Sequence, residues 1–142
     1  MARTDARGPL GMAEAITRCK LFWEAGADFT FLEAPQSETE MREYCTSVPG
    51  PKMANMLRHG STPSFKPREL GLMGFTLVAY PLDLLNASIR AYERCLGAIA
   101  SGNDLSAEDD LPFERTQEIV GFHEYWAEEK HYGLERNDTK HQ

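Results

Sequence analysis

The sequence predicts an α/β protein built from parallel βα units. Short apolar runs alternate with amphipathic stretches, an order that neither a helical bundle nor a β-sandwich would give. Four of the apolar runs end in "ARTDA", "FLEAP", "MANM" and "VAYPL", each of which leads into a loop or a helix. The length of 142 residues suits a single domain with one core.

The first two βα units are predicted from residues 1–47. A strand end at residues 1–6 is followed by a helix that begins near Pro9 and ends at Gly26. A buried strand over residues 29–35 then ends in a carboxylate. Ser37 and Glu40 form a capping box, which predicts a second helix over about residues 37–46, with Met41, Tyr44 and Cys45 facing inward.

The next two units are predicted from residues 51–102. The run "PKMANM" is a third strand end, a short helix runs from about residue 67 to 73, and residues 74–81 form a fourth apolar strand. The longest helix follows and ends before Gly102. Its predicted inner stripe is Leu85, Ile89, Tyr92, Leu96 and Ile99.

The last 40 residues are predicted to be organised differently. Residues 1–102 form the βα units, and the acidic, turn-forming residues 103–112 form a linker. Residues 113–132 are a helical segment broken near Gly121, and residues 133–142 form a polar, disordered tail.

Composition excludes several functional classes. The net charge of −7 and the lack of a basic stripe argue against nucleic acid, and no apolar run is long enough to span a membrane. The three cysteines, Cys19, Cys45 and Cys95, are far apart and indicate a reducing interior, with each expected to serve packing. We therefore expect a soluble intracellular protein, in the cytoplasm or an organelle.

Polar side chains gather at the strand ends. Arg3, Glu33 and Asn55 each follow apolar residues, and the carboxyl ends of parallel strands meet at one edge of a sheet. They would offer an anion clamp, a carboxylate and an amide, which suits a small carboxylic acid. On spacing alone, a buried ion-pair network of Arg3, Asp5 and Glu33 that caps the strands is an equal alternative.

A family resemblance covers nearly the whole chain. The stretches "ARTDA", "GMAEAITRCKLFWEAGAD", "FLEAPQSETEM", "PGPKMANM", "GSTP", "LGLMGFTLVAYPL" and "GFHEYWAEEKHY" resemble, in this order, the isocitrate lyase and phosphoenolpyruvate mutase superfamily. The resemblance is greatest to the branch of 2-methylisocitrate lyase, dimethylmalate lyase, oxaloacetate hydrolase and carboxyvinyl-carboxyphosphonate phosphorylmutase. The terminal "GFHEYWAEEKHY" favours the last group.

The resemblance implies a fold for the chain. In this superfamily the Arg-Thr-Asp run ends the fifth strand of a (β/α)₈ TIM barrel. The chain would then be the second half of such a barrel, plus C-terminal helices of the type exchanged between subunits. The superfamily's acidic Mg²⁺ ligands and its Lys-x-Cys-Gly-His loop precede this part, and neither motif occurs in the sequence.

The resemblance also implies roles for individual residues. Arg3 would grip a substrate carboxylate or a developing enolate oxygen, Glu33 would orient bound groups or metal water, and Asn55 would hydrogen-bond a substrate carboxylate. Thr62 in "GSTP" would add a hydrogen bond. At Pro81 the sequence resembles the carbon–carbon lyases, which have proline at that position, whereas oxaloacetate hydrolases typically have serine there.

These implications lead to several expectations of function. The first is part of a Mg²⁺-dependent lyase that cleaves a carbon–carbon bond in 2-methylisocitrate- or dimethylmalate-like carboxylates. A truncated, inactive chain, with Met1 standing where relatives often have an apolar strand residue, is the alternative. An oxaloacetate hydrolase or a phosphonate-related phosphorylmutase is a further one. A homo-oligomer, or a separate N-terminal half, would cover the open strand edges.

Overall fold

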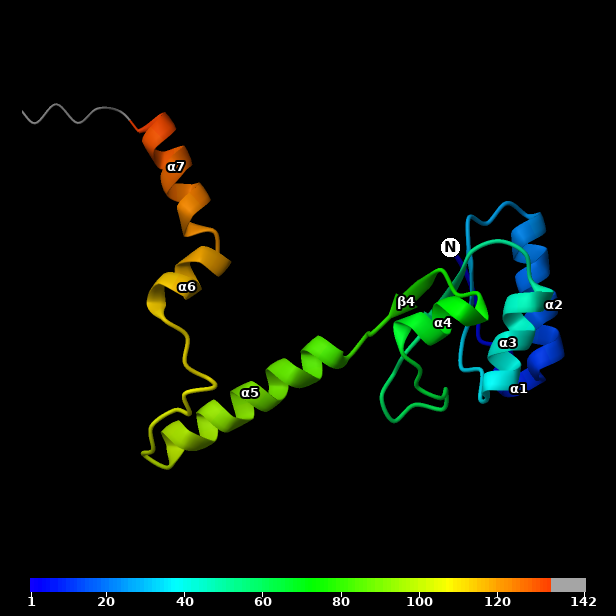
Figure 1. The fold of residues 1–142 in the computed structure, drawn as a ribbon, viewed down its shortest axis with the longest axis horizontal. Coiled ribbons are helices and arrows are strands. Elements are labelled where there is room, and N and C mark those ends of the chain that lie inside the picture. The colour runs from blue at the N-terminus through cyan, green and yellow to red at the C-terminus, as the bar shows by residue number, and fades with distance from the viewer. Residues whose placement is uncertain (134–142) are drawn as a thin grey trace, which may run out of the picture. The chain divides into compact units, whose positions relative to one another are not determined.

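A computed structural model describes residues 1–133, which fall into two compact units, residues 1–90 and the residues from 91 onward. The first unit contains β1 (Ala2–Thr4), α1 (Arg7–Leu10), α2 (Met12–Glu24), β2 (Thr30–Leu32), α3 (Glu38–Ser47), β3 (Lys52–Asn55), α4 (Pro67–Met73) and β4 (Leu77–Ala79). Helix α5 (Asp83–Ala100) begins in the first unit, and the second also contains α6 (Phe113–Ile119) and α7 (Phe122–Tyr132). Figure 1 shows these elements along the chain.

The four strands form one parallel sheet in the order β1-β2-β3-β4, which confirms the predicted α/β class. Each strand is followed by at least one helix, as the alternation of apolar and amphipathic stretches predicts. In the register, Arg3 pairs with Phe31, and Asn55 pairs with Ala79. The carboxyl ends of all four strands therefore lie along one edge of the sheet.

Helices α2, α3 and α4 supply the core on one face of this sheet (Figure 1). Leu32 of β2 and Ala54 of β3 belong to the core cluster, in which the helices contribute Ala15, Ile16, Cys19, Met41, Tyr44, Leu70 and Met73. Phe31 is also buried but lies outside this cluster. Because successive side chains of a strand point to opposite faces, the neighbours of Leu32 and Ala54 point away from the helices.

The helix expected from Pro9 to Gly26 is divided in two. Gly11 ends α1 and precedes α2 with φ of +87° and ψ of 172°, a conformation that glycine adopts far more readily than other residues. The prediction of one continuous helix was therefore wrong at its start. The apolar spacing is periodic from Met12 onward, which is where α2 begins.

The predicted cap of α3 is confirmed, but the capping box is incomplete. The Ser37 hydroxyl accepts a hydrogen bond from the Glu40 amide at 3.2 Å. The Glu40 carboxylate does not return to the Ser37 amide and accepts instead from the Gln36 amide at 2.6 Å. Met41 and Tyr44 are buried as expected.

The prediction that an apolar stripe of α5 faces inward is wrong, because its residues are not buried. Its five residues are 43% to 66% exposed, including Ile89 at the lower and Tyr92 at the upper limit. The apolar spacing is real, but such a pattern identifies the apolar side of a helix without specifying what covers it. Strand β4 is also partly exposed, since it lies at the edge of the sheet.

The second unit is described by itself. Residues 103–112 contain neither helix nor strand, and Asp109 in this segment is paired with Arg94 of α5. Helices α6 and α7 are separated at Val120 and Gly121, which confirms the predicted break. The predicted tail, apart from Gly133, lies outside the described residues. No helix within residues 1–133 is both long and apolar enough to cross a membrane.

Candidate functional site at the carboxyl edge of the sheet

The register places three of the predicted site residues on neighbouring strands or directly after them. Arg3 lies in β1, Glu33 follows β2, and Asn55 ends β3. The Glu33 amide donates to the Thr4 carbonyl at 3.0 Å, which continues the pairing of β1 with β2 beyond Leu32. Strand alternation directs these three side chains to the face opposite the helical core.

The Arg3 guanidinium is surrounded by acidic and aromatic groups. Its Nη2 and Nε donate to the two carboxylate oxygens of Asp5 at 2.7 and 3.2 Å, and Nη2 lies 3.5 Å from Oε2 of Glu33. Its central carbon lies 5.0 Å from the centre of the Phe31 ring. The hydrogen bond with Asp5, reinforced by Glu33, raises the pKa of Arg3, and Arg3 lowers the pKa of Asp5.

The pairs expected in the alternative network are present, but the network is not buried. The Arg3 and Asp5 side chains are 49% and 65% exposed, whereas that of Glu33 is 26% exposed. Exposed ion pairs contribute little to stability, so capping of the strands is a weak reason for this cluster.

Glu33 has an unused acceptor. Its Oε2 is buried and receives no hydrogen bond from the described residues, although Arg3 lies within ion-pair distance. Buried carboxylate oxygens normally have donors, so an atom without one is an exception that calls for a functional explanation. The next residue, Ala34, has φ of +57°, a left-handed conformation that is unfavourable for a residue with a Cβ.

Asn55 and Thr62 come together on a neighbouring part of the same edge. They line a narrow pocket of about 10 Å³ with Ala34 and Pro35 of the loop that follows Glu33. Pro81 is exposed in the turn between β4 and α5 and is not among the residues that line this pocket. The structure thus brings Arg3 to Glu33 and Asn55 to Thr62.

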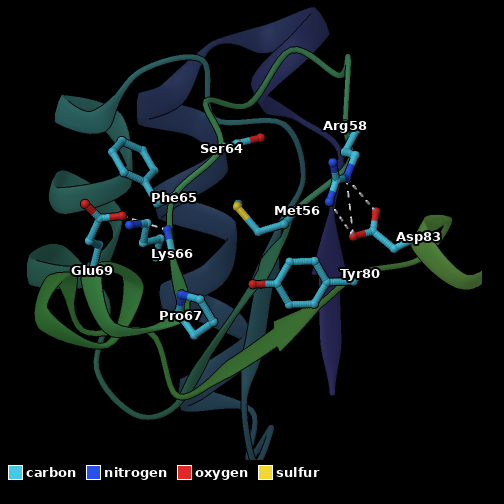
Figure 2. Close-up of a pocket in the computed structure, with 9 residues that line it drawn as sticks. All are labelled: Met56, Arg58, Ser64, Phe65, Lys66, Pro67, Glu69, Tyr80 and Asp83. Carbon is cyan, nitrogen blue, oxygen red and sulfur yellow. Dashed lines mark hydrogen bonds and ion pairs between the residues drawn. The ribbon is translucent and has the colours of Figure 1, made fainter.

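Two residues at this edge were not singled out from the sequence. Arg58, after β3, lies 3.3 to 3.5 Å from the carboxylate of Asp83 at the start of α5. This pair lies beside a cavity of about 450 Å³. Figure 2 shows the pair with the other residues that line the cavity, which are Met56, Ser64, Phe65, Lys66, Pro67, Glu69 and Tyr80. The strand-end argument used for Asn55 would have found both, because each follows a strand within four residues.

The described residues contain no large cluster of metal-ligating side chains. Residues 1–133 contain no group of three or more His, Cys, Asp or Glu side chains that could hold a metal ion. The two carboxylates nearest the predicted site, Asp5 and Glu33, are both paired with Arg3. Cys19 and Cys45 pack in α2 and α3, where burial raises the pKa of each thiol to about 11.

Parallel βα units with polar side chains at the carboxyl ends of the strands form the arrangement in which α/β proteins usually build their ligand sites. The sequence profile of the phosphoenolpyruvate phosphomutase family matches residues 1–100. The chain belongs to this family, within the phosphoenolpyruvate mutase/isocitrate lyase superfamily.

The relatives of this chain include lyases and a mutase. The chain is 36% identical over 132 residues to 2-methylisocitrate lyase of Bacillus subtilis, and the alignment covers 92% of this chain and 44% of that protein. It is 38% identical to the petal death protein of Dianthus caryophyllus, over 90% of this chain and 41% of that protein. Identity to the chloroplastic carboxyvinyl-carboxyphosphonate phosphorylmutase of Arabidopsis thaliana is 36%, over 96% of this chain and 42% of that protein. The chain thus spans less than half the length of these relatives.

Solved structures show the same fold. A crystal structure of 2,3-dimethylmalate lyase matches with a TM-score of 0.81 and 27% identity, over 92% of this chain and 46% of that one. A phosphonopyruvate hydrolase complex with oxalate and Mg²⁺ matches with a TM-score of 0.71 and 23% identity, over 92% and 47%. Coverage below half agrees with the expectation that this chain is part of a barrel.

Proposed function

We propose that residues 1–90 supply half of the substrate site of a lyase that cleaves a carbon–carbon bond in a 2-methylisocitrate- or dimethylmalate-like carboxylate. The observation that supports this proposal most is the placement of Arg3 in β1, Glu33 directly after β2 and Asn55 at the end of β3, on three adjacent parallel strands. Similarity to 2-methylisocitrate lyases and a dimethylmalate lyase supports the substrate class.

Each residue has a chemical role in this proposal. Arg3 binds a substrate carboxylate, or the enolate oxygen that gains charge as the bond breaks, after exchanging its exposed partner Asp5. Glu33 orients the bound molecule through its carboxylate, whose side chain is 26% exposed and lies 3.5 Å from Arg3. Asn55 and Thr62 add hydrogen bonds to a second carboxylate, next to the loop that follows Glu33.

The proposal includes Mg²⁺ and a partner for this chain. When bound, Mg²⁺ would stabilise the developing negative charge, and its ligands would come from outside residues 1–133. That outside part is a complementing N-terminal half. The alternative partner, a second copy of this chain, would cover the open strand edges but would not supply the Mg²⁺ ligands. The chain alone is then inactive, because arginine and amide groups position a substrate without supplying an acid–base group.

The test is a chimera in which this chain replaces the matching part of the Bacillus subtilis 2-methylisocitrate lyase. Cleavage of 2-methylisocitrate with Mg²⁺ is expected in the chimera and not in the isolated chain. Arg3→Lys should lower kcat/KM by about 100-fold, the usual effect of losing one donor to a developing oxyanion. Arg18→Lys is the matched control, because Arg18 pairs with Glu14 on the surface of α2.

The same chimera decides between the candidate reactions. Pro81 favours cleavage of 2-methylisocitrate or dimethylmalate over hydrolysis of oxaloacetate, so the first two should be the better substrates. Preference for oxaloacetate or a phosphonate would favour the hydrolase or phosphorylmutase alternative. A chimera that melts cooperatively like the parent enzyme but acts on none of these substrates would contradict the proposal, as would activity in the isolated chain.

A further inference from the structure

A second arginine–carboxylate pair lies beside the candidate site. Arg7, at the start of α1, donates through Nε and Nη2 to the two carboxylate oxygens of Glu40, in the first turn of α3, at 3.0 and 2.6 Å. The two side chains are only 19% and 20% exposed. This bidentate geometry and partial burial distinguish the pair from ordinary surface ion pairs, which contribute little to stability.

The same carboxylate holds the loop that begins with Glu33. Oε2 of Glu40 also accepts a hydrogen bond from the Gln36 amide at 2.6 Å, and the Glu40 amide donates to Ser37 at 3.2 Å. At its other end, the loop is fixed by the hydrogen bond from the Glu33 amide to Thr4. The loop between β2 and α3 is therefore held at both ends, with Arg7 and Glu40 at the second.

The loop needs this support because its backbone is strained. Ala34 has φ of +57°, and a residue with a Cβ keeps such a conformation only where its surroundings impose it. Ala34 follows Glu33 directly, so a change in this backbone would disturb the peptide next to the Glu33 side chain. The pKa of Glu40 is lowered, first by Arg7 and further by the Gln36 amide, so the carboxylate is charged at neutral pH.

We propose that Arg7 and Glu40 are positioning residues that lock the loop of residues 33–37 and thereby hold Glu33 against Arg3. This inference rests on the proposed function for the role of Glu33. The locking of the loop itself is a property of the chain that can be measured without substrate.

The first experiment measures amide hydrogen exchange in the full chain. Glu40→Ala should speed exchange at the Gln36 amide by about tenfold, because the variant loses one charge-assisted hydrogen bond to this amide. Glu40→Gln, which keeps an acceptor without the charge, should give an intermediate rate. Glu38→Ala is the matched control, since Glu38 lies in the same helical turn and pairs with Arg42 instead of the loop.

The pattern of exchange separates locking from general stability. Amides of β2 and β3 should exchange at the same rate in the Glu40→Ala and Glu38→Ala variants. Equal rates at Gln36 in these two variants, or a uniform loss of protection across the sheet in Glu40→Ala, would overturn the inference.

The second experiment measures cleavage in the chimera. Glu40→Ala should lower kcat/KM by about tenfold or more, because a small misplacement of a positioning group is costly, and Glu38→Ala should leave it unchanged. An active chimera that is insensitive to Glu40→Ala overturns the positioning role and leaves the proposed function intact. A chimera inactive in every variant overturns the proposed function, and the exchange rates then decide whether Arg7 and Glu40 lock the loop.

Discussion

The buried hydroxyl pair beneath the sheet offers a sharp test of the fold. The Tyr44 and Thr30 hydroxyls lie 2.7 Å apart, and both side chains are fully buried. Tyr44→Phe removes one hydroxyl and leaves that of Thr30 without its partner. An unsatisfied buried polar group costs about 1–3 kcal/mol, so the free energy of unfolding should fall by that amount. Both hydroxyls lower the pKa of the buried Cys19 thiol, so this thiol lies close enough to replace part of the lost interaction, which favours the lower end.

A double-mutant cycle isolates the interaction. Thr30→Val alone should also destabilise, because it leaves the Tyr44 hydroxyl buried without its partner, whereas removal of both hydroxyls leaves neither group unpaired. The double variant should therefore cost less than the sum of the single variants. Urea unfolding of the full chain, followed by circular dichroism, measures all four proteins. Strict additivity, or a Tyr44→Phe variant as stable as the parent, would refute the reasoning.

Three further predictions concern α4 and α3. Leu70→Ala should lower the free energy of unfolding by about 2–5 kcal/mol in urea, while Leu72→Ala, in the same helix but 77% exposed, should change it by less than about 0.5 kcal/mol. Gly74→Ala should lower the melting temperature, because φ is +111° and the new Cβ would meet a cysteine Cβ of α3 at 3.2 Å. Gly71→Ala, with open space around it, should raise the melting temperature instead. The side-chain carboxyl of Glu40 should titrate below 4.5 by NMR. Its stabilising contribution is then complete above pH 4.5 and is lost as the pH falls through the lower pKa of the folded state. A titration midpoint at or above 4.5 would contradict the ion pair.

Local sequence patterns were sufficient to predict most elements of the first unit. Four apolar runs correspond to the four strands, the cap at Ser37 is formed, and α4 has the expected bounds. These features depend on residues within one helical turn or one strand of each other, which is the range over which spacing is informative. The break at Gly11 was missed because glycine is compatible with both a helix start and a turn.

The failures share a dependence on distant residues. Ile89 and Tyr92 are exposed because no other element within the described residues covers them. The periodicity of a helix cannot reveal whether another element packs on its apolar side. The carboxylate of Glu40 was expected at Ser37 and is instead bound to Arg7, which is 33 residues away. For the candidate site, the sequence predicted which strand ends carry polar groups and included the pairing of Arg3 with Asp5 as an alternative, but it did not reveal that this pair is exposed.

The contacts that order the candidate site all lie within residues 1–90. The Arg3 side chain is paired with Asp5 and Glu33, and the backbone of Asn55 is fixed by its strand pairing with Ala79. These contacts are local to the first unit, so the requirement for a partner in the proposed reaction is chemical more than architectural. One guanidinium faces two carboxylates, and a substrate carboxylate must displace the more exposed one, Asp5, before Arg3 can bind it. The positive charge needed to favour that exchange is the contribution that the proposed Mg²⁺ and complementing half would make.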